Sequence, residues 1–159
     1  MFKKEDISIS EISTYSFSVY FIFVLVGLVI DLAFFSQKIL PPNHSTYIGF
    51  GIITLSTIVI YWARGTGKNY RKNSHRYNEL EHENLKKGAF KFTRNPHYIG
   101  VGTLFLGLSI VMNSLAILVL ATLSFIVVNA WFIPHEELIL EERHGKHFKK
   151  YKDTTRRWF

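Results

Sequence analysis

The chain has 159 residues, of which 48% are hydrophobic and 19% are charged, and its formal net charge is +7. Its apolar residues come in long runs instead of at the spacing of an amphipathic helix, which argues against a soluble bundle and for a membrane protein. The sequence contains no cysteine, so disulfides, thiolate nucleophiles and cysteine-ligated zinc are excluded, and we predict no metal site.

Apolar windows predict an all-α fold: an integral membrane helical bundle of about four transmembrane helices with a cytoplasmic C-terminal helix. A helix needs about 20 apolar residues to cross the hydrocarbon core, and the third window is shorter than that. Asp31 is an ionised residue within the first window, and we expect it to lie at a solvated helix end. The windows are Phe17 to Phe35, Thr46 to Ala63, Ile99 to Met112 and Leu115 to Ile133.

These windows divide a single membrane domain, residues 1–159, into successive segments. A polar lead precedes a first helical hairpin, a cytoplasmic polar segment follows, and a second hairpin leads into a cytoplasmic tail that we expect to be helical. In chain order the segments are 1–16, 17–63, 64–97, 98–133 and 134–159.

Short motifs mark the ends of the predicted helices. Pro41-Pro42-Asn43 predicts the turn of the first hairpin, and Asn113-Ser114 predicts that of the second. Proline suits the first turn of a helix because its missing amide donor would be unpaired there, so Pro96 and Pro134 predict helix starts. Gly65-Thr66-Gly67-Lys68 lacks the spacing of a phosphate-binding loop and predicts a flexible exit from the second helix.

Basic residues predict the orientation in the membrane. Of the 19 Lys and Arg residues, only Lys38 lies between the first two windows, and the others fall on one side of an even-numbered topology. The positive-inside rule makes that side cytoplasmic and places both termini there. We expect the plasma membrane in a prokaryote or the endoplasmic reticulum in a eukaryote. Attraction to anionic lipid explains the net charge, so nucleic acid is not predicted as a partner.

Two polar clusters flank the second predicted hairpin. Arg94 precedes the helix that Pro96 opens, where free backbone amides and a guanidinium favour an anionic group. Glu136 and Glu137 follow the last apolar window and should attract a cation. Together the clusters suit a zwitterion such as S-adenosylmethionine. The alternative is that Arg94 anchors the helix at lipid headgroups and that the glutamates pair with nearby lysines.

Two blocks of residues carry a family pattern. The first contains Gly88, Phe90, Thr93, Arg94, Asn95-Pro96, Tyr98 and Gly100. The second contains Glu136-Glu137, Leu140, Gly145, Phe148, Tyr151 and Arg157. On these residues the chain, from Leu85 to its C-terminus, resembles the isoprenylcysteine carboxyl methyltransferase and phospholipid methyltransferase group of membrane enzymes. The resemblance implies S-adenosylmethionine as cofactor and a prenylated or phospholipid acceptor.

The resemblance also implies site residues. Cofactor contacts would fall on His82, Leu85, Phe90, Asn95, Pro96, His97, Tyr98 and Glu136, with His75 a weaker candidate. Glu136 or Glu137 would accept a proton from an amine acceptor, and Arg94 would orient an acidic one, so these three are the predicted catalytic residues.

Two positions depart from the family pattern. Asn95 replaces a histidine, and its amide donates and accepts hydrogen bonds but carries no charge. Phe132 stands where the prenylcysteine branch has an arginine, which weakens that branch's substrate for this chain. These departures motivate one alternative, a non-catalytic membrane protein of the same fold. A second alternative is an NADPH-dependent membrane reductase, because sterol reductases share a similar C-terminal pattern.

Overall fold

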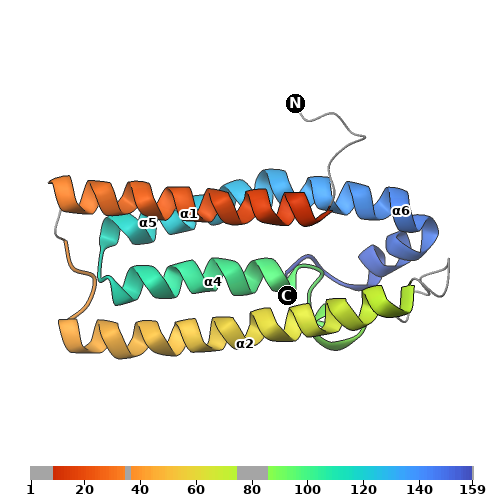
Figure 1. Cartoon of the computed structure of the whole chain (residues 1–159), viewed down its shortest axis with the longest axis horizontal. Helices are drawn as coiled ribbons and strands as arrows, with labels where there is room; N and C mark the ends of the chain where they lie inside the picture. Colours follow the sequence, from red (N-terminus) through yellow and green to blue (C-terminus); the bar gives the residue numbers. More distant parts are fainter. Residues whose placement is uncertain (1–8, 35–36, 75–85, 159) are drawn as a thin grey trace. The chain divides into compact units, whose positions relative to one another are not determined.

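The computed structural model describes residues 9–34, 37–74 and 86–158, and every regular element within these ranges is helical (Figure 1). This confirms the predicted all-α fold class for the described part of the chain. The elements are α1 (Ile9–Phe34), α2 (Pro42–Ser74), η1 (Gly88–Lys91), α4 (Pro96–Val111), α5 (Leu115–Val127), η2 (Val128–Phe132) and α6 (Ile133–Thr154).

Three stretches of helix are long and apolar enough to cross a membrane: Glu11–Phe34, Pro42–Thr66 and Leu115–Thr154. The helix over the third predicted window, α4, is apolar but has only 16 residues, as its short window predicts. Pro96 begins this helix and Asn113-Ser114 forms the turn that follows it, which confirms both predictions.

The last apolar window and the tail form one continuous helical stretch, whereas the sequence predicts a separate helix that starts near Pro134. The reason lies in η2, a turn of π-helix at Val128–Phe132. Proline inside an α-helix removes a backbone hydrogen bond and crowds the carbonyl four residues earlier. A widened π turn directly before Pro134 therefore lets the helix continue through it.

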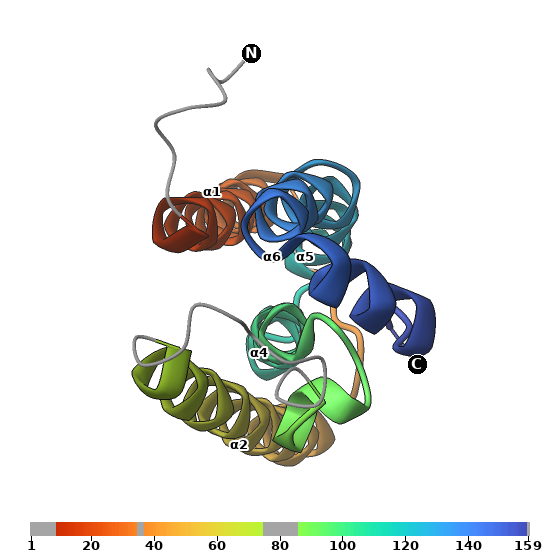
Figure 2. The same ribbon diagram turned by 90° about the vertical axis from the view of Figure 1, so that its right-hand side faces the viewer.

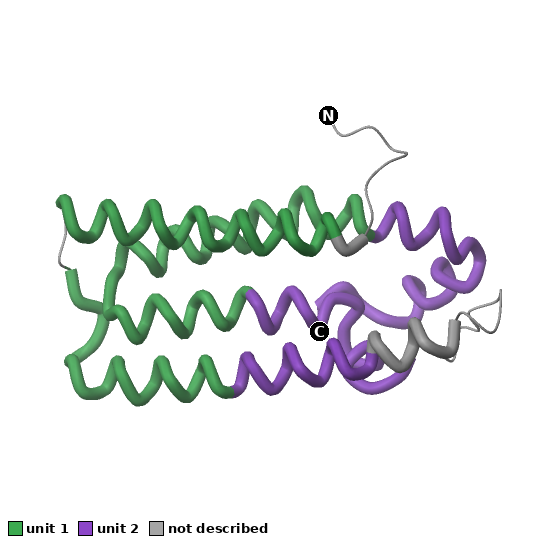
Figure 3. Tube along the Cα trace, viewed as in Figure 1, with its two compact units in different colours: residues 1–54, 102–136 green, residues 55–101, 137–159 purple. Residues whose placement is uncertain are grey.

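The chain divides into two compact units, drawn in separate colours in Figure 3. The first comprises residues 1–54 and 102–136. In it α1 packs along α5 so closely that a Cβ on Gly27 would come 2.9 Å from the Cα of Ile117. Likewise, a Cβ on Gly107 of α4 would lie 3.1 Å from the backbone nitrogen of Ile53 in α2. Small residues at such contacts let membrane helices approach each other closely.

Asn113 joins two loops at one end of this unit. Its Oδ1 accepts hydrogen bonds from the backbone amides of Ile39 (2.9 Å) and Leu40 (3.0 Å), and its Nδ2 donates to the Leu40 carbonyl (2.8 Å). The next residue, Ser114, caps α5 and donates to Asp31 Oδ1 at 2.5 Å. Asp31 lies near the end of α1, as expected. It is half-buried, and a protein hydroxyl is its hydrogen-bond partner.

Asn113→Ala should lower the stability of the detergent-solubilised protein by about 2 kcal/mol, because it leaves two amides and one carbonyl without their partner. Asn113 also has φ = 52°, a left-handed conformation that glycine adopts without strain. Asn113→Gly should thus lose less stability than Asn113→Ala, and the exposed Asn43→Ala should change the melting temperature little. Equal melting temperatures for wild type and Asn113→Ala would contradict this role.

The second unit comprises residues 55–101 and 137–159. Within it α2 continues to Ser74, so the prediction of a flexible exit at Gly65-Thr66-Gly67-Lys68 is wrong. Thr66 there lies against Gly88, and a Cβ on Gly88 would collide with the Thr66 hydroxyl. Gly88 also has φ = 55°, a conformation that favours glycine. The contact with the segment before α4 supports a helix that its glycines alone would disfavour.

In the same unit α6 changes direction at Gly145, whose φ and ψ of 50° and −124° are not helical. Figure 2 shows the arm after this residue running in a different direction from the arm before it. This turn brings the residues after Gly145 back along the segment that precedes α4. The sequence predicts one cytoplasmic helix here, and the structure has two arms joined by an elbow.

Candidate functional site

The C-terminal residues hold the segment before α4 in place within the second unit. Thr93 Oγ1 donates to the Arg157 carbonyl at 2.6 Å, and the Arg94 amide donates to the Arg156 carbonyl at 3.1 Å. Tyr151 Oη donates to the Phe90 carbonyl at 2.8 Å. We call residues 151–157, together with the segment 90–94 that they hold, the C-terminal clasp. It fixes the backbone directly before Asn95-Pro96.

Glu137 lies buried beneath this clasp, with 4% of its surface exposed. Its carboxylate accepts from Arg157 Nη2 at 2.8 Å and from Arg157 Nε at 3.3 Å. Arg94 Nη2 lies 3.5 Å away, and Lys152 Nζ lies 4.0 Å away. Paired guanidinium contacts of this kind fix direction as well as charge. Glu137 therefore orients Arg94 and ties the start of α6 to the chain's last residues.

Around this ion pair, several buried polar atoms have no hydrogen-bond partner in the described part of the second unit. They are Nε and Nη1 of Arg94, Nδ2 of Asn95, Nδ1 of His97 and Oγ1 of Thr155. A buried polar atom without a partner is costly, so native proteins rarely keep one without a reason. The atoms on Arg94 and Asn95 are obligate donors. Such a set of donors suits an anionic or acceptor-rich ligand.

Most of the predicted site residues fall within this unit. Asn95, Pro96 and Tyr98 are buried, Phe90 and His97 are half-buried, and the rings of His97 and Tyr98 lie 6.1 Å apart. Glu136 is half-buried in the first unit. His75, His82 and Leu85 lie outside the described residues. The π turn contains Phe132, the second departure from the family pattern.

The structure adds roles that sequence reasoning did not assign. Arg157 and Tyr151 are part of the family pattern quoted above, but their partners Glu137 and Phe90 are far away in sequence. The family pattern includes Tyr151 and Arg157, so it was the signal in the sequence that marked these two positions as important. Glu137, predicted to attract a cation, has protein cations as its partners. They are Arg157 and Arg94, together with Lys152 at 4.0 Å, so the alternative reading of a lysine partner holds in part for Glu137.

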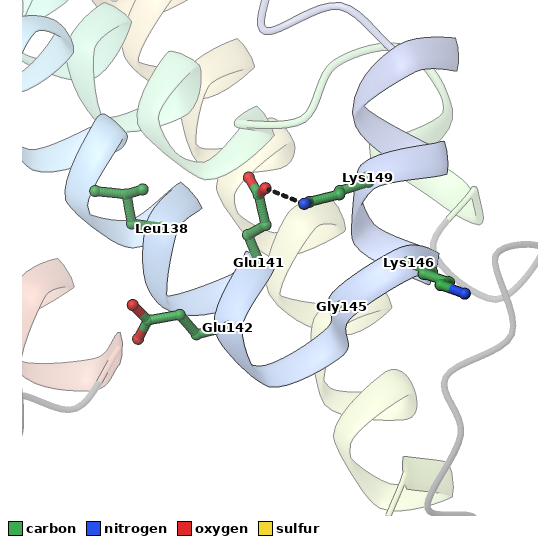
Figure 4. A pocket seen from close by; sticks show the side chains of 6 residues that line it. All are labelled: Leu138, Glu141, Glu142, Gly145, Lys146 and Lys149. Atoms are coloured by element: carbon green, nitrogen blue, oxygen red, sulfur yellow. Dashed lines mark ion pairs between the residues drawn. The ribbon is translucent and has the colours of Figure 1, made fainter.

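A separate pocket of about 370 Å³ lies at the elbow of α6, lined by Leu138, Glu141, Glu142, Gly145, Lys146 and Lys149 (Figure 4). Lys149 pairs with Glu141 at 3.3 Å across the turn, and Lys152 also pairs with Glu141, at 3.5 Å. The contact with Lys149 is the main cause of the lowered pKa of the Glu141 carboxyl, which lies beyond the apolar part of its helix. The pocket contains no predicted site residue, and its exposed ion pairs hold the elbow's arms together.

Comparison with known protein families matches residues 45–147 to the family described as phospholipid methyltransferase. Comparisons with curated proteins and with solved structures give no match. The matched range includes the segment before α4, the whole of α4 and α5, and both Glu136 and Glu137. It covers more than half of the chain, and the chain therefore belongs to the phospholipid methyltransferase family.

Proposed function

We propose that this protein is an S-adenosylmethionine-dependent methyltransferase that acts on a lipid or lipid-like acceptor at the membrane. Family membership implies methyl transfer in general, and the long apolar helices are consistent with a membrane location. The observation that carries the finer proposal is a set of buried nitrogens without a partner among the described residues: donors on Arg94 and Asn95, together with Nδ1 of His97.

These residues fit the cofactor chemically. The amino-acid end of S-adenosylmethionine carries a carboxylate, and the unpaired nitrogens of Arg94 and Asn95 are donors that a carboxylate accepts from. His97 Nδ1 donates or accepts according to its tautomer and suits a polar edge of the adenine or ribose. Phe90 and Tyr98 supply aromatic surface for adenine or for cation–π contact with the sulfonium.

We assign different roles to the two adjacent glutamates. Glu137 is held by Arg157 and Arg94, so its proposed role is to position Arg94 rather than to take a proton. Glu136 is the candidate that meets the cofactor ammonium or accepts a proton from an amine acceptor. This division replaces the interchangeable roles that the sequence suggests for the pair.

Glu136→Ala should weaken S-adenosylmethionine binding at least tenfold, about 1.4 kcal/mol, if this carboxylate meets the cofactor ammonium. Isothermal titration calorimetry on detergent-purified protein measures the change. Glu142→Ala removes an exposed carboxylate six residues along the same helix and should leave the affinity unchanged. An unaltered dissociation constant for Glu136→Ala would remove Glu136 from the site.

Catalysis in this proposal depends on positioning more than on acid–base chemistry. When bound, S-adenosylmethionine supplies a methyl group activated by its sulfonium for in-line displacement. Arg94 and Asn95 hold the cofactor's carboxylate, and the clasp keeps their backbone fixed. Asn95 and Tyr98 are buried, so a cofactor held against them would be shielded from water. Orientation and desolvation of this kind account for a large part of many rate enhancements.

We further propose that the site faces the cytoplasm, with both termini on that side. In an even-numbered topology, all Lys and Arg residues except Lys38 fall on the side of the termini, and the positive-inside rule makes that side cytoplasmic. The anionic cytoplasmic leaflet attracts these residues. An acceptor that enters from the lipid would then reach the cofactor at the inner surface. A cysteine introduced at exposed Lys146 and one at Lys38 should react with a membrane-impermeant thiol reagent from opposite sides of sealed vesicles.

Two titrations test the proposed activity. Calorimetry with S-adenosylmethionine and with NADPH should give binding of the first compound only. Binding of NADPH alone would favour a reductase, and binding of neither would favour a non-catalytic member of the family. Incubation of the purified protein with lipid extract and methyl-labelled cofactor should then label a lipid fraction, and label confined to water-soluble products would contradict a lipid acceptor.

A further inference from the structure

The first unit contains a second group of unpaired polar atoms, away from the residues assigned above. Tyr20 of α1 is fully buried, yet its hydroxyl has no hydrogen-bond partner among the described residues. Asn129 of η2 has a buried Oδ1 that also has none. Both lie in helices long and apolar enough to span the membrane, where an unpaired polar atom finds no bulk water.

The surroundings of Tyr20 are apolar and closely packed. Its ring stacks on Phe105 of α4, with ring centroids 5.3 Å apart and planes 7° apart. Its hydroxyl reaches Gly102, because a Cβ built there would lie 3.5 Å from Tyr20 Oη and 2.7 Å from Cδ2 of Phe125. Phenylalanine at position 20 would fill the same space without an unpaired hydroxyl, so packing alone does not explain the tyrosine.

Asn129 lies in an element that packs against the helix of Tyr20, since η2 contacts α1. It follows Phe125 by four residues, across the join between α5 and the π turn. The residue is half-buried although its Oδ1 is fully buried, so its amide runs from the outer surface of the helix towards the interior. The π turn that contains Asn129 is a type of local distortion that often occurs at functional sites.

We propose that Tyr20 and Asn129 form a binding site for the hydroxyl group of an apolar molecule among the membrane helices. The phenol of Tyr20 donates a hydrogen bond, and Oδ1 of Asn129 accepts one. A hydroxyl group does both, and it carries no charge that would be costly to bury. A mostly apolar lining with a few polar groups is typical of small-molecule sites. The ligand class is therefore a long-chain alcohol or a lipid with a free hydroxyl.

Thermal denaturation in detergent tests this site with two probes of equal chain length, 1-dodecanol and n-dodecane, at equal mole fraction in the micelles. At ten times its dissociation constant, the alcohol should raise the melting temperature of the wild-type protein by about 3 °C or more relative to the alkane. Tyr20→Phe and Asn129→Leu should each abolish this difference. Tyr47→Phe, which removes a hydroxyl at an exposed position of α2, should retain it.

Equal effects of alcohol and alkane on the wild type would overturn the proposal and would leave water as the partner of these atoms. Persistence of the difference in either variant would overturn it as well. Tyr20→Phe is nearly isosteric and removes only an unpaired hydroxyl, so its fold should be at least as stable as the wild type; it decides alone where the leucine variant fails to fold. Neither the cofactor nor methyl transfer enters the test, so its failure is distinct from failure of the proposed activity.

Discussion

Glu137→Ala should destabilise the protein by about 3 kcal/mol, because it leaves two guanidinium groups around a buried position without their common carboxylate. The value lies at the lower end for broken buried ion pairs, since the side chain of Arg157 is 32% exposed and partly solvated. The melting temperature in detergent measures the loss. Limited proteolysis should show faster cleavage near the C-terminus, because Arg157 no longer holds residues 151–157 against the chain.

Glu141→Ala is the matched control for this variant. Glu141 also pairs with cations from the arm beyond Gly145, but the side chains of its partners Lys149 and Lys152 are 64% and 39% exposed. Solvent screens exposed ion pairs, so the control should lose little stability. A double-mutant cycle of Glu137→Ala with Arg157→Ala should give a substantial coupling energy. Additive effects of the two substitutions would contradict the assigned ion pair.

Arg94→Ala should weaken S-adenosylmethionine binding by about ten- to a hundredfold, because hydrogen bonds to a charged group contribute about 1.5–3 kcal/mol. The stability of the fold should change less than in Glu137→Ala, since Glu137 keeps Arg157 as its closer partner. Arg94→Lys retains the charge but lacks the planar fork, so its affinity should fall between those of the wild type and the alanine variant.

Arg143→Ala provides the control for lost positive charge, because Arg143 is exposed on α6 and belongs to no assigned site. Calorimetry on the three variants separates the roles. Wild-type affinity in Arg94→Ala together with a large loss of melting temperature would make Arg94 a structural partner of Glu137 and nothing more.

The sequence predicts the helices well where one strong local signal exists. Long apolar runs identify the helices that are long enough to cross a membrane, and Pro96 and Asn113-Ser114 mark a start and a turn that the structure confirms. Local sequence signals predict the wrong structure where a contact between residues far apart in the chain stabilises a helix. The glycines at 65 and 67 disfavour a helix by about 1 kcal/mol each, yet α2 continues through both, and only the fold brings Gly88 against Thr66.

The candidate site was likewise predictable only in part: the sequence identifies its residues but not the contacts between them. The family pattern identifies Arg94, Asn95 and Glu137 as residues of interest, but it does not give their partners. Glu137 and Arg157 are 20 residues apart, a separation that corresponds to no common face of a straight helix. The elbow at Gly145 creates their contact, and a single glycine within a helical sequence is a weak predictor of such a reversal.

The length of the helical arm between Gly145 and the clasp limits which insertions and deletions this chain can tolerate. One residue inserted into a helix rotates everything beyond it by about 100° and shifts it by about 1.5 Å. Such an insertion after Gly145 would turn Tyr151 away from Phe90 and remove Arg157 from Glu137, although every side chain would still be present. The number of residues between the elbow and the clasp is thus under as strong a constraint as their identity.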